Sequence, residues 1–122
     1  MAGRKSFNRV DRVRKEMIRE LSDIIQHRVK DPLLNNVVVS VTDVDVAPDF
    51  THAKVFISIF GDETLREAIM GVLEDNRKMI RQELGSRVRL RHTPELDIRY
   101  DESLERGSRV TELLNQISRG EL

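Results

Sequence analysis

The chain has 122 residues, 39% of them hydrophobic and 34% charged, which predicts a single domain over residues 1–122 with an aliphatic core. The absence of cysteine excludes disulfides and thiolate metal sites, and no apolar run is long enough for a membrane helix. We therefore expect a cytoplasmic protein with no membrane partner.

The formal net charge is zero, but the charges are unevenly distributed. Residues 1–30 carry nine Lys and Arg against four Asp and Glu, and residues 76–91 carry six against one. Residues 31–75 carry two against nine. Screening confines each field to about 8–10 Å, so two basic segments that fold together would form a basic surface on a neutral protein. The alternative is that each segment is only the solvated side of a helix.

Residues 1–5 form a short basic arm that we expect to be flexible. A long helix follows after an N-cap at Ser6 or Asn8. Asp31-Pro32 ends it, because proline disfavours helical geometry in the residue before it. The apolar positions recur at spacings of three and four: Val10, Val13, Met17, Leu21, Ile24, Ile25 and Val29.

Two strands are predicted next, over residues 37–46 and 52–60, joined as a hairpin. In the first, the apolar positions change face after Val41, which predicts a bulge or strong bend near Thr42. The second alternates cleanly between apolar and polar residues.

Residues 64–84 show a second helical pattern. A capping-box match of Thr64 with Glu67 marks its start, and Gly85 marks its end. Asn76 falls on the apolar stripe and Arg77 and Lys78 follow it, so we predict a break or kink there. The first turn after the break would offer free backbone N–H groups and a positive dipole end to a phosphate. The alternative is one continuous surface helix.

From residue 88 apolar residues take the even positions and arginines the odd ones. Pro94 interrupts this pattern, so a third strand is predicted over residues 95–100. A last helix starts at Asp101 or Ser103 and ends at Gly120, leaving residues 119–122 as a short tail. Its apolar positions are Leu104, Val110, Leu113, Leu114 and Ile117.

This order predicts an α+β domain, α-β-β-α(kinked)-β-α, with a three-stranded sheet and helices packed on one face. It matches the type II KH arrangement of RNA-binding domains. An ordinary KH domain clamps the nucleic-acid backbone with a G-x-x-G loop between two helices. Here Asn76-Arg77-Lys78 stands in place of that loop.

Several short motifs follow one another along the chain. They are the Arg-rich first helix, Val29-Lys30-Asp31-Pro32-Leu33, Ala53-Lys54-Val55-Phe56, Ile80-Arg81 with Leu84-Gly85, Arg89-Leu90-Arg91 with Pro94-Glu95-Leu96, and Tyr100-Asp101 with Ser103. In this order they resemble the ribosome-binding factor A family of bacterial small-subunit assembly factors. In that family a helix–kink–helix with an Ala-x-Gly motif replaces the KH loop, and Asn76-Arg77-Lys78 occupies those positions here.

The resemblance implies a non-catalytic ribosome biogenesis factor. It implies binding to the immature small (30S) subunit and its 16S rRNA, and promotion of late maturation, including processing of the 16S 5′ end. It also implies that the bound domain holds or displaces rRNA elements near the neck of the subunit. No cofactor is expected, and we expect a monomer.

Electrostatic docking on RNA phosphates is the physical hypothesis, because the few aromatic residues leave base stacking a minor term. The kinked helix contributes Asn76 as well as cations. The predicted RNA-binding residues are Arg4, Lys5, Arg9, Arg12, Asn76, Arg77, Lys78, Arg81, Arg87, Arg89 and Arg91.

Nothing in the sequence favours an enzyme. His27, His52 and His92 are isolated, without ligand spacing to one another, and no Gly-rich phosphate motif follows a strand. Two alternatives stay open. One is a protein-interaction module that uses the acidic surface of residues 31–75, and the other is a KH-like RNA-binding protein that acts outside the ribosome.

Overall fold

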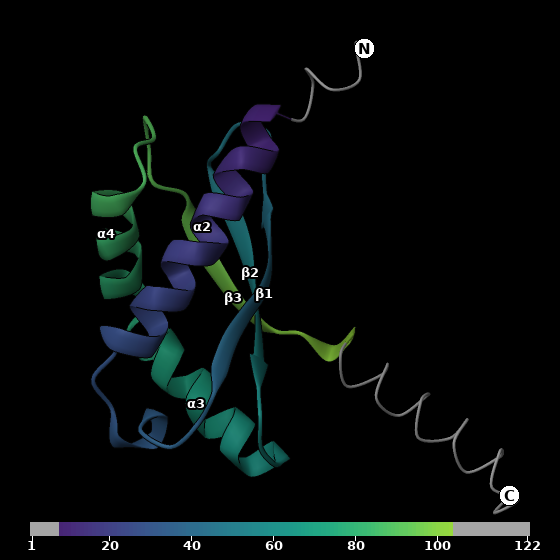
Figure 1. Ribbon diagram of the computed structural model, residues 1–122, viewed down its shortest axis with the longest axis vertical. Helices are drawn as coiled ribbons and strands as arrows, with labels where there is room; N and C mark the ends of the chain where they lie inside the picture. Colours follow the sequence, from purple (N-terminus) through teal and green to yellow (C-terminus); the bar gives the residue numbers. More distant parts are fainter. Residues whose placement is uncertain (1–7, 104–122) are drawn as a thin grey trace, which may run out of the picture.

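The structure is a computed structural model that describes residues 8–103 (Figure 1). The predicted basic arm, the last helix beyond Ser103 and the tail lie outside the described residues. In chain order the elements are α2 (Asn8–His27), the 3-10 turn η1 (Pro32–Leu34), β1 (Val39–Val46), β2 (His52–Ile59), α3 (Glu63–Asp75), α4 (Arg77–Arg87) and β3 (Glu95–Tyr100). This is the predicted order as far as the described residues extend.

The sheet has the order β1-β2-β3, with β1 and β2 antiparallel and β2 and β3 parallel. The predicted bulge is confirmed, because the register between β1 and β2 shifts between Val41 and Asp43. The extra residue, Thr42, lets Val44 and Val46 return to the buried face after Val41.

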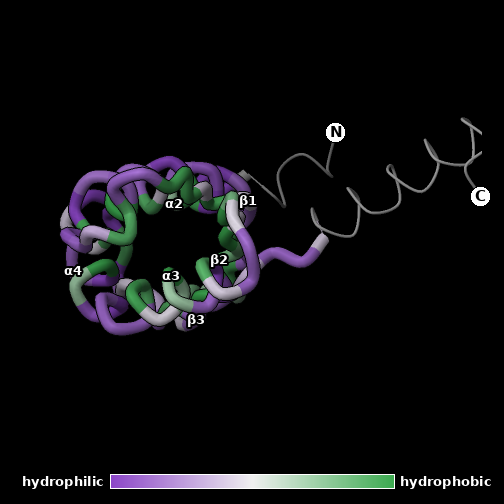
Figure 2. The backbone as a smooth tube through the Cα atoms, turned by 90° about the horizontal axis from the view of Figure 1, so that it is seen from below, coloured by the Kyte–Doolittle hydropathy of each residue, from purple (hydrophilic) through white to green (hydrophobic). Residues whose placement is uncertain are grey.

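The helices cover one face of the sheet, as predicted. Buried residues alternate with exposed or half-buried ones along each strand, α2 packs on β1 and α4, and both α3 and α4 contact β3. In Figure 2 the hydrophobic stretches of α2, α4 and the strands face one another across the interior. Within residues 8–103 the buried core contains only Met, Leu, Ile, Val and Ala side chains, which agrees with the expected aliphatic core.

The break at Asn76 is confirmed, and the continuous-helix alternative is wrong. Asn76 ends α3 with φ −99° and ψ 6°, outside helical geometry, and α4 starts at the next residue. Its side-chain amide Nδ2 donates to the carbonyl oxygen of Val72 at 2.8 Å, so the polar group on the apolar stripe satisfies a carbonyl at the end of α3.

The predicted ends of this helical stretch are wrong at both sides. Asp62, not Thr64, is the N-cap, because its extended backbone lets Oδ1 accept the N–H of Leu65 at 2.8 Å. Gly85 does not end the helix, which continues to Arg87. Gly85 instead allows close packing, since a Cβ there would lie 2.6 Å from Oγ1 of Thr93.

The first two strands are shorter than predicted at the end of the hairpin away from the turn. β1 begins at Val39 rather than residue 37, and β2 ends at Ile59 rather than residue 60, because the regular pairing stops at these two residues. Beyond it, the Phe60 N–H still donates to the Val38 carbonyl oxygen at 3.4 Å. Both side chains are exposed.

Candidate nucleic-acid interface

The segment between α4 and β3, residues 88–94, is called the basic loop below. Val88 is buried and Leu90 packs against the core, whereas Arg89 and Arg91 are exposed. Within residues 8–103 neither of these arginines has an ion-pair or hydrogen-bond partner. The loop therefore presents two unpaired guanidinium groups to solvent.

Arg81 contacts the backbone of the basic loop. Its Nε donates to the carbonyl oxygen of Pro94 at 3.0 Å, and its Nη2 donates to the carbonyl oxygen of Thr93 at 2.6 Å. Its Nη1 lies 3.5 Å from the Glu95 carboxylate. The sequence predicted Arg81 as an RNA ligand, but the folded chain gives this guanidinium intramolecular acceptors.

Arg87 belongs to a group of charged residues between α2 and α4, called the α2–α4 ion-pair cluster: Arg87, Glu20, Asp23 and Glu83. The Nη1 of Arg87 lies 2.6 Å from Asp23 and 3.6 Å from Glu20, and its Nη2 lies 3.4 Å from Glu83. The hydrogen bond from Arg87, with a second one from His27, lowers the pKa of Asp23. Arg87, also a predicted RNA ligand, thus joins two helices.

At the junction of α3 and α4, one predicted RNA ligand has partners within the fold and its neighbour has none. Arg77 pairs with Glu74 at 3.2 Å and reaches the carbonyl oxygen of Leu96 at 3.5 Å. Lys78 is exposed and has no partner within the described part of the chain. The Asn76 amide does not cap α4, whose N-terminus has no side-chain hydrogen bond.

The N-terminal end of α2 presents Arg9 and Arg12, both exposed. The Arg9 guanidinium carbon lies 5.4 Å from the ring centroid of Phe50, in the turn between β1 and β2. Phe50 has a φ of 60°, the left-handed region that non-glycine residues rarely adopt. Arg12 has no partner among residues 8–103. The predicted ligands Arg4 and Lys5 lie outside the described residues.

Helical spacing indicates that Arg9 and Arg12 lie on the side of α2 that faces α4. Positions 9, 12, 20 and 23 are separated by multiples of about one turn, and Glu20 and Asp23 both contact Arg87 of α4. In Figure 1 the N-terminal end of α2 and the basic loop lie at the same, upper end of the molecule, whereas α4 begins at its other end, near the middle of the molecule where α3 stops. The basic loop and the N-terminal end of α2 thus lie at one end of the molecule, and the start of α4, which bears Lys78, lies away from that end.

The predicted RNA-binding set leaves out several exposed basic residues, and two of these lie beside its members. Arg19 is exposed and lies two turns beyond Arg12 on the same side of α2, which the spacing of seven could have revealed. His92 is exposed in the basic loop next to Arg91.

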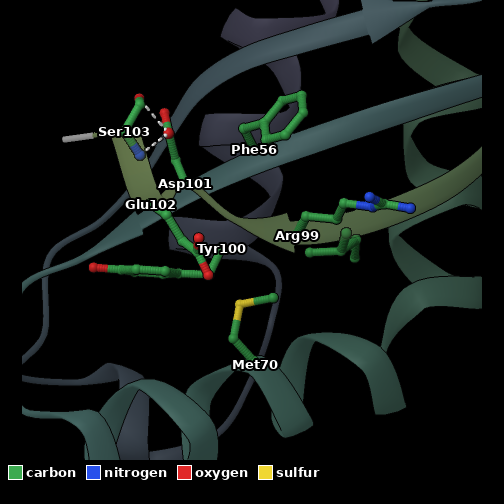
Figure 3. Close-up of a pocket in the computed structure, with 8 residues that line it drawn as sticks. Phe56, Met70, Arg99, Tyr100, Asp101, Glu102 and Ser103 are labelled. Atoms are coloured by element: carbon green, nitrogen blue, oxygen red, sulfur yellow. Dashed lines mark hydrogen bonds between the residues drawn. The ribbon is translucent and has the colours of Figure 1, made fainter. Parts of the chain in front are cut away.

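A surface hollow lies where the chain leaves β3, lined by Phe56, Met70, Ile98, Arg99, Tyr100, Asp101, Glu102 and Ser103 (Figure 3). The Asp101 carboxylate accepts hydrogen bonds from Ser103 and, at 2.6 Å, from the hydroxyl of Thr42. These bonds lower the pKa of Asp101 below its usual value, and the bond from Ser103 has the largest effect. The bulge residue of β1 thereby helps to fix the end of β3.

Neither metal-binding nor membrane-spanning features occur in the described part of the chain. Residues 8–103 contain no group of three His, Cys, Asp or Glu side chains placed to hold a metal ion. Within the same range, no helix combines the length and the apolar character that crossing a bilayer requires.

Comparison with known proteins gives consistent matches. The family model for ribosome-binding factor A matches residues 9–114. The ribosome-binding factor A of Clostridium botulinum (strain Okra / Type B1) is 46% identical over 113 residues, which cover 93% of this chain and 93% of that protein.

Solved structures of related proteins share the fold. The crystal structure of ribosome-binding factor A from Thermus thermophilus matches with a TM-score of 0.64 and 24% identity, covering 74% of this chain and 93% of that one. A homology model of the Thermus thermophilus factor, fitted into a cryo-EM map of its 30S complex, matches with a TM-score of 0.61 and 25% identity, covering 73% and 91%.

These neighbours have the KH-like fold, which confirms the predicted fold class. The family match spans most of the chain, and the relative's identity extends over nearly its whole length. The chain belongs to the ribosome-binding factor A family.

Proposed function

We propose that this protein binds the immature small ribosomal subunit in the cytoplasm and contacts its 16S rRNA through the unpaired cations described above. It acts as a non-catalytic monomer that promotes late maturation, including processing of the 16S rRNA 5′ end. Family membership carries this proposal, together with the description of a Thermus thermophilus relative in a complex with the 30S subunit.

The distribution of charge supports a phosphate-binding surface. Arg12, Arg89 and Arg91 are exposed without partners among residues 8–103, and the elements that bear them lie at one end of the molecule. Exposed arginines bind phosphates in bidentate geometry and lose little solvation when they do so. Arg9, Lys78 and the cations of residues 1–5 would add to this surface.

Shape and backbone recognition would dominate over base stacking. Phe60 is the one aromatic residue among the large hydrophobic side chains that are exposed in residues 8–103, and Phe50 and Phe56 are half-buried. A surface of this kind recognises the phosphate geometry of a folded RNA rather than its base sequence. It suits a factor that holds rRNA elements in place until the subunit matures.

The binding test is the dissociation constant of the full chain for purified immature small subunits between 50 and 200 mM salt. If about six phosphates are neutralised, the affinity falls by roughly three decades over this range. Gradient sedimentation of a lysate at the same salt concentrations identifies the partner, since the protein should travel with free small subunits and not with mature ribosomes. A flat salt response contradicts an electrostatic footprint.

The protein-interaction alternative has one observation in its favour. Val38 and Phe60, at paired positions beside the first two strands, are 66% and 87% exposed, near the acidic residues Asp62 and Glu63. Exposed apolar side chains of this size are typical of protein contacts. If this surface carried the function, the reversal of arginines in the basic loop would leave subunit binding unchanged.

A further inference from the structure

We infer that Arg81 is a positioning residue: together with Gly85 and Thr93 it fixes the conformation in which the basic loop presents Arg89 and Arg91 to RNA. This inference rests on the proposed function for its ligand. The order of the loop, however, can be measured without any RNA.

The guanidinium of Arg81 is occupied by the loop itself. Its Nε and Nη2 donate to the carbonyl oxygens of Pro94 and Thr93, at 3.0 and 2.6 Å, and Nη1 faces the Glu95 carboxylate at 3.5 Å. A planar fork can bridge two successive carbonyl groups, whereas the single ammonium group of a lysine cannot reproduce that geometry. Arg81 therefore differs from Arg89 and Arg91, which have no partner in residues 8–103.

A second, uncharged contact lies one helical turn further along α4. The backbone of Gly85 is so close to Thr93 that a Cβ would lie 2.6 Å from Oγ1 and 3.6 Å from the Thr93 Cβ. Positions 81 and 85 are four residues apart and so lie on the same side of the helix. Both contacts thus hold the same end of the basic loop.

The other end of the loop is fixed as well. The Val88 N–H donates to the carbonyl oxygen of Leu84 at 2.9 Å, Val88 is buried, and Leu90 packs on the core. With both ends fixed, the backbone at Arg89 and Arg91 is ordered before any ligand arrives. Preorganisation of this kind lowers the entropy that binding must overcome.

The test compares Arg81→Lys and Arg81→Gln with the wild-type full chain. For a positioning residue, both variants weaken subunit binding by about tenfold, the effect expected when two arginine side chains lose their ordering. For a direct phosphate contact, Arg81→Lys stays within about twofold of wild type, and only Arg81→Gln lowers the salt slope, by about one. The second pattern overturns the inference.

Hydrogen exchange supplies the readout that does not depend on RNA. Arg81→Lys should speed exchange of the Val88 and Glu95 amides by at least about tenfold while the amides of β1 and β2 keep their protection. These two amides flank the loop and donate to the carbonyl oxygens of Leu84 and Thr51, both at 2.9 Å. Unchanged protection of both amides overturns the inference. If wild-type protein shows no salt-dependent subunit binding but the loop loses protection, the proposed function fails and the positioning role stands.

Gly85→Ala repeats the test without any change in charge, and it also serves if the Arg81 variants fail to fold. The added methyl group forces Thr93 to move, so loop exchange should rise and binding should weaken several-fold. Gly85→Ala/Thr93→Ala removes the clash and should restore both. Since alanine favours helix over glycine, the double variant should melt no lower than wild type. A double variant that binds as poorly as Gly85→Ala contradicts the positioning role.

Discussion

The α2–α4 ion-pair cluster and the basic loop adjoin one another along the chain, yet their arginines have opposite surroundings. Arg87 contacts three carboxylates and its side chain is 23% exposed. Arg89, only two residues later, is exposed and has no partner among residues 8–103. The same residue type thus stabilises helix packing in one region and remains available for a ligand in the next.

This difference shows that a basic run in a sequence does not measure the charge available to a partner. Arg87 lies where α2 presents Glu20 and Asp23, so its charge is neutralised within the fold. Arg89 and Arg91 lie on a loop whose nearby carbonyl groups are already bonded by Arg81. Availability depends on which acceptors the fold has placed within reach and which of them are already used.

The largest expected effect comes from charge reversal in the basic loop. Arg89→Glu/Arg91→Glu should weaken binding to small subunits by at least about 100-fold at 0.1 M salt, because each lost phosphate contact costs about tenfold. The melting temperature should stay within about 2 °C of wild type, since surface substitutions away from structural contacts have small effects. Competition binding and thermal unfolding measure the two quantities.

The matched control is Arg99→Glu, an exposed arginine on the uncovered face of the sheet that pairs with Asp97 at 2.8 Å. It reverses a charge of the same kind elsewhere and should change the affinity by less than about threefold. The single substitution changes the charge by half as much as the double one. A loss of about tenfold in Arg99→Glu would therefore mean that net charge, rather than the basic loop, determines binding.

An intermediate loss of subunit affinity is expected at the start of α4, where substitutions of Arg77 and Lys78 should have different effects. Lys78→Gln should weaken binding by about tenfold and lower the salt slope by about one, because Lys78 has no partner within residues 8–103. Arg77→Gln should cost less, because Arg77 already pairs with Glu74. Affinities measured at three salt concentrations check both slopes. If Arg77→Gln has the larger effect, the ion pair does not limit the availability of Arg77.

The smallest expected effect on binding is that of Arg87→Gln, which should leave subunit affinity within about twofold and lower the melting temperature at pH 7 by a few degrees. Arg87 lowers the pKa of Asp23 from the ordinary value of 3.8, so the stabilisation is present above that pH. It is lost as the pH falls and Asp23 takes up a proton. The difference between wild type and variant should therefore shrink below about pH 4. A difference that is as large at pH 2.5 as at pH 7 contradicts this assignment.

Much of the fold follows from local patterns in the sequence. Period-two and period-3.6 patterns predicted the strands and helices within about three residues, and the change of face after Val41 predicted the bulge. The first helix ends at His27, before the predicted stop at Asp31-Pro32. Asn76 predicted the break between α3 and α4 because a polar amide on an apolar stripe conflicts with a buried helix face. The N-cap was misassigned because Asp62 and Thr64 are both good capping residues, and only the backbone path selects one.

The sequence by itself determined which residues face the core and which carry charge, because both follow from side-chain chemistry and the short repeats of helix and strand. Only the tertiary structure decided what the charges do. Arg87 meets Asp23 across a separation of 64 residues, and Gly85 meets Thr93 across a turn that the sequence did not reveal. Such contacts depend on how elements pack in three dimensions, and no local pattern encodes the distance between a guanidinium group on one helix and a carboxylate on another.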